Sequence, residues 1–204
     1  LGAQHHGAAG GPVGARVVAD REAGHIGQAA GVQHGQAKTP AVSFAEKDEA
    51  LAGASTLVLA DLDQDGALDA VSAGRGGLHL LRGEAGRLAD VTEKAGLSGI
   101  AASAAVAGDY DNDGLPDLVA STPRGLALLH NEGGGRFKVE AAPVPAWPHA
   151  AATAAFVDID HDGDLDVFAA VGEAGGPGLL LRNNGDRTFT DITASAQLGG
   201  AGGA

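Results

Sequence analysis

The amino-acid sequence predicts an all-β fold built from three copies of one unit with short strands. Three observations carry this prediction. An acidic nine-residue motif occurs three times, at spacings of 48 and 49 residues. Short apolar runs, several of which contain β-branched residues, flank each motif and are closely bounded by glycine. This pattern is typical of strands rather than helices. Thirty-four glycines among 204 residues indicate many turns, which again suits short strands.

The motif places carboxylates at positions 1, 3, 5 and 9 of a loop and glycine at position 6. Its copies span residues 61–69, 109–117 and 158–166. Carboxylates this close together repel one another unless a cation lies among them. Calcium takes about six to eight oxygen ligands in flexible geometry, and alternate aspartates in a tight loop can provide them. The sequence therefore predicts about three Ca²⁺ ions, one in each loop.

The predicted ligands are the same five positions in every copy. Side chains 1, 3 and 5 can turn toward one centre because glycine at position 6 permits a backbone conformation that other residues resist. Position 7 varies among the copies, as expected if only its carbonyl is used, and the carboxylate of position 9 closes the site. These residues are Asp61, Asp63, Asp65, Ala67 and Asp69; Asp109, Asp111, Asp113, Leu115 and Asp117; and Asp158, Asp160, Asp162, Asp164 and Asp166.

Other interpretations of the loops fit less well. Magnesium prefers strict octahedral geometry and retained water. Zinc would need histidine or cysteine, and position 4 offers only Gln64, Asn112 and His161, which we expect to point outward. An EF-hand would need glutamate at position 12, where the copies carry serine or alanine. A solvated Asp-Gly turn that binds nothing explains one copy better than three at near-equal spacing.

The motif and its flanks resemble FG-GAP or VCBS-type repeats. The segment from Val106 to Gly114, Val-Ala-Gly-Asp-Tyr-Asp-Asn-Asp-Gly, is close to that family's signature, and the resemblance covers about residues 44–198. It implies four-stranded β-propeller blades like those of the integrin alpha-subunit head, with calcium between the first two strands. Because such propellers usually have seven blades, three repeats imply a partial propeller or a fragment of a larger one.

The apolar runs predict four strands in each repeat. In the second repeat we expect them at about 103–107, 117–121, 125–130 and 136–141. A run at 42–46 resembles the fourth strands and is assigned to a preceding or a closing blade. The predicted parts are a largely irregular Gly/Ala/His-rich arm at 1–41, blades at about 42–92, 93–142 and 149–198, and a frayed tail at 199–204.

Two features outside the repeats allow alternatives. The arm holds one expected strand within 13–20 and four histidines, which are either metal or haem ligands or simply exposed polar residues. The lack of cysteine for haem attachment favours the second interpretation. Trp147 lies in a Pro-rich link at 143–150, where it is a contact anchor or, as we favour, packs between blades. The arm histidines are His5, His6, His25 and His34.

Charge and hydropathy restrict the partners. The net charge is −13, and thirteen of the 26 acidic residues lie inside the three loops, so the acidity is mainly local. It argues against nucleic acid and anionic membranes, which attract basic patches. No apolar run reaches about 18 residues, so no transmembrane helix is expected. Weak calcium loops work where calcium is about millimolar, which predicts a periplasmic or extracellular location.

These observations predict a non-enzymatic, calcium-stabilised scaffold that binds other proteins, including subunits of a larger or membrane-anchored assembly. Every recognisable motif is structural, and an open arc of blades leaves faces that favour association. A carbohydrate-binding or adhesion module, in which calcium bridges a ligand, is one alternative. A propeller-based hydrolase or lyase is another, although no nucleophile elbow, His-Glu-x-x-His or phosphate loop appears and no catalytic residue is assigned.

Overall fold

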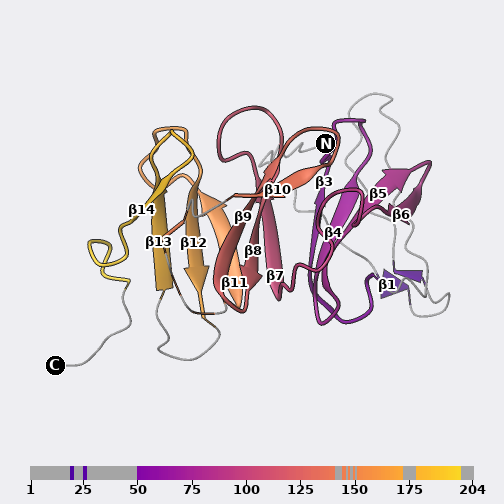
Figure 1. The fold of residues 1–204 in the computed structure, drawn as a ribbon, viewed down its shortest axis with the longest axis horizontal. Helices are drawn as coiled ribbons and strands as arrows, with labels where there is room; N and C mark the ends of the chain where they lie inside the picture. The colour runs from indigo at the N-terminus through magenta and orange to yellow at the C-terminus, as the bar shows by residue number, and fades with distance from the viewer. Residues whose placement is uncertain are drawn as a thin grey trace, which may run out of the picture.

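The described residues form an all-β structure, as predicted. The computed structural model describes residues 19–20, 25–26, 50–140, 144–145, 147, 149, 151–171 and 178–198. Three four-stranded antiparallel sheets follow one another along the chain and lie side by side in Figure 1. Within these described residues there is no helix, and so none long and apolar enough to cross a membrane.

Each large sheet is a meander whose strands pair in sequence order. The first sheet contains β3 (Ala54–Ala60), β4 (Asp69–Gly74), β5 (Gly77–Glu84) and β6 (Arg87–Asp90). The second contains β7 (Ala104–Gly108), β8 (Asp117–Thr122), β9 (Gly125–Asn131) and β10 (Phe137–Val139). The third contains β11 (Thr153–Val157), β12 (Asp166–Ala170), β13 (Gly178–Asn183) and β14 (Phe189–Asp191).

The four strands predicted for the second repeat coincide with β7 to β10, of which β10 is shorter than expected. A small sheet pairs β1 (Ala19–Asp20) with β2 (His25–Ile26), and β1 falls inside the strand predicted within 13–20. The rest of the arm with His5, His6 and His34, the run at 42–46, the tail at 199–204 and residues 172–177 lie outside the described residues.

Strand burial follows from the position of each strand in its sheet. The second strands β4 and β8 are buried along nearly their whole length and, after the aspartate that begins each, consist of small or apolar residues. The first strand β3 alternates between exposed and half-buried residues. This difference arises because a second strand is covered on both faces, whereas β3 has a covered face and an open one.

Two apolar cores lie between neighbouring sheets and hold the row together. The first joins sheets one and two through residues such as Leu80 and Leu118, and the second joins sheets two and three through residues such as Val119 and Leu181. The sheets approach closely where β7 meets β11, since a Cβ atom at Gly108 would lie 2.6 Å from the ring of Phe156. Small residues therefore set the spacing of the sheets.

Trp147 packs against the second core and is half-buried. Its carbonyl oxygen closely approaches Gly125, where φ is +115° and a side chain would collide with it. The structure thus agrees with the interpretation that this tryptophan packs between blades rather than standing free as a contact anchor.

Candidate metal centres

Each acidic loop connects the first two strands of a sheet, and strand pairing fixes both of its ends. In the second sheet, Gly108 pairs with Asp117 directly across the mouth of the loop. The same pairing joins Ala60 to Asp69 and Val157 to Asp166. Because strands rather than helices flank the loops, the EF-hand alternative does not apply.

The first aspartate of each loop points back over its own backbone. In loop two, Asp109 accepts hydrogen bonds from the N–H groups of Asp113 and Gly114 at 3.1 and 2.9 Å. Asp113, at position 5, accepts one from the N–H of Leu115 at 2.8 Å. Loop one repeats this pattern closely. These bonds close the loop into a compact turn with its carboxylates gathered inside.

The left-handed backbone extends over two positions of each loop. The predicted glycine at position 6 has φ of +86°, +88° and +96° in the three copies. Position 4 is also left-handed, with φ of 60° at Gln64, 58° at Asn112 and 64° at His161, which sequence reasoning missed. The position-4 side chains point outward as predicted, and two of them reach the next loop. Gln64 donates to the carbonyl of Gly114 and Asn112 to Asp164 Oδ1, both at 2.7 Å.

The last aspartate of each loop is the most buried. Asp117 accepts hydrogen bonds from the N–H groups of Tyr110, at 3.3 Å, and Asn131, at 2.7 Å, and so joins the loop to the end of β9. Burial raises its pKa to about 6, although the backbone hydrogen bonds act against this shift. The negative charge of Asp111 also raises this pKa, and His130 lowers it. Burial likewise raises the pKa of Asp69.

Three of the five predicted ligands converge in every loop. The carboxylates at positions 1, 3 and 9 offer oxygen atoms that all lie within 4.8 Å of one another. The position-5 aspartates Asp65, Asp113 and Asp162 lie outside these trios, and the carbonyls at position 7 remain predicted ligands. The trios are Asp61, Asp63 and Asp69; Asp109, Asp111 and Asp117; and Asp158, Asp160 and Asp166.

Two of the three position-3 carboxylates contact basic side chains that sequence reasoning missed. Asp63 lies 2.6 Å from Nη2 of Arg82, near the end of β5. Asp111 lies 2.7 Å from Nη2 of Arg187, which belongs to the β13–β14 turn of the next sheet, and 3.4 Å from Nδ1 of His130. A signal was present for two of these residues, since a basic side chain ends the third-strand run in every repeat. Arg187 had no local signal.

Loops one and two are each also held by the sheet that follows them. The side-chain amide of Asn131 donates to the carbonyl of Leu62 in loop one at 2.8 Å, and that of Asn183 donates to the carbonyl of Tyr110 in loop two at 2.7 Å. Both asparagines end the third strand of their sheet. Loops one and two therefore connect neighbouring sheets through hydrogen bonds as well as being candidate ion sites.

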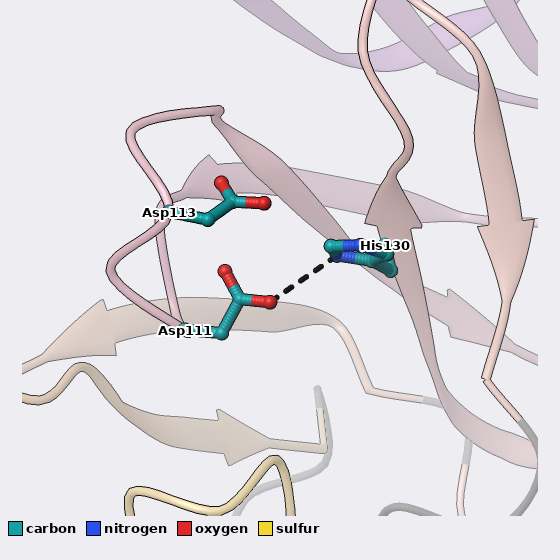
Figure 2. Close-up of side chains that lie close together, drawn as sticks. All are labelled: Asp111, Asp113 and His130. Atoms are coloured by element: carbon teal, nitrogen blue, oxygen red, sulfur yellow. Dashed lines mark ion pairs between the residues drawn. The ribbon is translucent and has the colours of Figure 1, made fainter.

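The donor set fits a hard cation. In loops one and three the converging side-chain atoms are all carboxylate oxygens, the ligands that Ca²⁺ prefers. In loop two, the side chain of Asp111 is only 4% exposed; its Oδ2 lies 2.7 Å from Arg187, whereas its Oδ1 has neither a hydrogen bond nor an ion-pair partner. A buried carboxylate oxygen without a partner is costly, and a cation bound in the loop would supply one. Figure 2 shows Asp111 and Asp113 turned toward the same space as His130.

The family of the chain follows from its sequence. The FG-GAP-like repeat family matches residues 61–120 and, overlapping them, residues 109–169. The two matches together span more than half of the 204 residues. The chain belongs to the FG-GAP-like repeat family. Each match contains two successive acidic loops, which the structure places in neighbouring sheets, so the resemblance of the motifs and the blade-type sheets are both confirmed.

Comparisons with curated proteins and solved structures do not indicate a function for this FG-GAP-like protein. No curated protein matches the chain in sequence. One similar solved structure is described as the basis of specific recognition of non-reducing terminal N-acetylglucosamine by an Agrocybe aegerita lectin. It has a TM-score of 0.45 and 20% identity, and the match covers 66% of this chain and 36% of that chain. The FG-GAP-like chain thus spans about a third of the lectin's length.

Proposed function

We propose that this FG-GAP-like protein is a non-enzymatic scaffold, stabilised by about three Ca²⁺ ions, that binds other proteins outside the cytoplasm. Its partners include subunits of a larger or membrane-associated assembly. The observation that carries the proposal is an exposed apolar face on the first strand of the first blade. The equivalent face of each of the other two blades is covered by the blade before it.

The exposed face belongs to β3. Val58 and Ala60 point toward the first core and pack against it. The residues that alternate with them point the other way, and Leu57 and Leu59 there are 47% and 36% exposed. These two leucines are neighbours on the same face of the strand, and together they form an apolar surface suited to protein contact.

The matching positions of the other blades show what covers such a face. Ala105 and Ala107 on β7 pack in the first core, and Phe156 on β11 packs in the second. In both cases the preceding blade covers them. We infer that the face of Leu57 and Leu59 receives a protein surface of the same kind, a β-sheet of a partner protein.

Calcium has a structural role in this proposal. The three converging carboxylates of each loop, with the predicted ligands at positions 5 and 7, would hold the ion. Bound calcium supplies positive charge that offsets the repulsion among these carboxylates. Because the loops also carry the hydrogen bonds to the next sheet, calcium would stabilise the stacking of blades. Loops of this class bind weakly, which supports a location where calcium is about millimolar.

The proposal is tested by finding what lies on the β3 face in cells. A photo-crosslinking amino acid is introduced at position 57 and, in a control variant, at position 198, where Leu198 is 40% exposed in another part of the molecule. We expect a partner protein to crosslink at position 57 and not at position 198. Equal products at the two positions, or none at position 57, would overturn the proposal.

A partner found in this way is then purified and its affinity is measured. We expect saturable binding that weakens by about tenfold or more in Leu57→Ser, since a buried leucine at an interface contributes a few kcal/mol. The matched control is Leu198→Ser, which should bind as the unaltered protein does. Binding that is the same in all three proteins, or a catalysed reaction of the partner, would contradict the scaffold role.

A further inference from the structure

The second loop differs from the first in the third-strand side chain that contacts it, a histidine in place of an arginine. Near the end of this strand, the equivalent basic residue is Arg82 in the first repeat, His130 in the second and Arg182 in the third. A guanidinium stays protonated and has no lone pair for a metal, whereas a neutral imidazole is the commonest metal ligand among side chains. The second loop alone therefore combines carboxylates with a nitrogen ligand.

The geometry brings this imidazole into the loop. His130 is 9% exposed, and its Nδ1 atom lies 3.1 Å from Asp117 Oδ1 and 3.4 Å from Asp111 Oδ2. One ligand atom each from Asp111, Asp113 and His130 lie within 4.8 Å of one another. Figure 2 shows the three side chains pointing into a common space, two from the loop and one from β9. Tyr110 packs edge-on against the imidazole ring, with ring centroids 6.3 Å apart.

The state of Asp111 is an independent sign of a missing ligand. In loop one the equivalent Asp63 is engaged through both oxygens, by Arg82 and by the N–H of Asp65. Asp111 is just as buried, and its Oδ1 has neither a hydrogen bond nor an ion-pair partner. Arg187 and His130 approach only its other oxygen. Buried polar atoms are nearly always satisfied in native proteins, so an unsatisfied carboxylate oxygen aimed into a loop indicates an ion.

The geometry points to a mixed nitrogen–oxygen site in the second loop, formed by His130, Asp111 and Asp113, that takes a transition metal of the Zn²⁺ class. Zinc is bound by imidazole nitrogen and carboxylate oxygen and needs fewer ligands than calcium. The inference rests on the proposed function in one respect, that the acidic loops are metal sites. The first and third loops offer oxygen ligands only and would hold calcium alone, whereas the second loop would hold Ca²⁺ when Zn²⁺ is absent.

The test measures Zn²⁺ binding to the full chain in excess calcium, by competition with a chromophoric chelator. His130→Arg reproduces the residue of the first and third repeats. The control, His161→Gln, removes a histidine from loop three and reproduces Gln64 of loop one. All other histidines are the same in these proteins and contribute equally to Zn²⁺ binding. A loss of binding that is found in His130→Arg and not in His161→Gln therefore reports on loop two.

We expect His130→Arg to lose one Zn²⁺ site, or to bind at that site about tenfold or more weakly, while His161→Gln binds as the unaltered protein does. Bound Co²⁺ should give absorption bands of a nitrogen–oxygen site that disappear in His130→Arg. Identical Zn²⁺ isotherms for the unaltered protein and His130→Arg would overturn the inference.

A second variant keeps the test decisive if His130→Arg does not fold. Asp113→Asn retains an acceptor for the N–H of Leu115, and the residue is exposed, so the fold should survive. It should also weaken Zn²⁺ binding, and an unchanged affinity would contradict the site. Failure of the calcium proposal is distinguishable, because it would appear as no Ca²⁺ binding in the absence of zinc, whatever the Zn²⁺ result.

Discussion

The side-chain amide of Asn183 donates a hydrogen bond of 2.7 Å to the backbone carbonyl of Tyr110, 73 residues earlier in the chain and in the acidic loop of the preceding blade. Asn131 makes the equivalent bond to Leu62. In the first two blades, the acidic loop is thus the segment to which the next blade is hydrogen-bonded. Ion binding and blade stacking therefore act on the same backbone segments.

Removing this amide should destabilise the protein. Asn183 is buried, and Asn183→Ala leaves the carbonyl of Tyr110 without its donor, so we expect a loss of about 1–3 kcal/mol in the free energy of unfolding. Chemical denaturation measures this loss. The control is Asn184→Ala, an exposed neighbour, which should cost clearly less. Equal losses for the two variants would show that the bond between blades contributes little.

The close approach of β7 and β11 gives a second prediction. Gly108→Ala places a Cβ atom about where the Phe156 ring lies, so the sheets must shift, at a cost of about 1–3 kcal/mol. The check is a double-mutant cycle with Phe156→Ala, which removes the ring. We expect the two losses to be non-additive, with the alanine at position 108 better tolerated when the ring is gone. Simple addition would mean that the two residues do not limit the spacing.

The left-handed backbone at position 4 of the acidic loops gives a third prediction, which concerns stability. Asn112 has φ of 58°, a conformation that glycine adopts freely and a β-branched residue resists. Asn112→Gly and Asn112→Val both remove the amide that contacts Asp164, so their difference isolates the backbone. We expect the valine variant to be less stable by about 1–2 kcal/mol in thermal or chemical unfolding. Equal stability would mean that the loop changes its conformation.

The buried carboxyl of Asp117 gives a prediction about pH for the metal-free protein. Its pKa is raised by burial from the ordinary 3.8 to about 6. The folded state therefore holds this proton more tightly than the unfolded state does. The stabilisation from this group is complete below about pH 3.8 and is lost as the pH rises through about 6. Carboxyl ¹³C NMR in chelator should show Asp117 titrating near pH 6, and titration near pH 4 would contradict this account.

Local patterns explain why much of the fold could be predicted. The acidic motif and the short apolar runs are contiguous in sequence, and they mark the loop and the strands of each blade directly. Glycine at position 6 was recognisable because only glycine adopts that conformation without strain. Position 4 was missed because glutamine in the first copy lacks the left-handed preference that asparagine and histidine show in the other two.

The contacts between blades could not be predicted because their partners are far apart in sequence. Arg187 reaches Asp111 from the next sheet, and Asn183 reaches back to Tyr110. Nothing in the residues around Asp111 indicates either contact. His130 is an intermediate case, since aligning the repeats shows a histidine where the others carry arginine, although only the structure places its ring beside the loop.

Calcium titration tests the central claim most directly. Chelator-treated protein is titrated with Ca²⁺ by calorimetry, and its melting temperature is followed in parallel. We expect about three binding sites and a rising melting temperature, since a site with a Kd of about 0.1 mM would add about 1.4 kcal/mol at about 1 mM calcium. No binding at millimolar calcium, with a melting curve unchanged by chelator, would contradict the account and leave the acidic loops as turns.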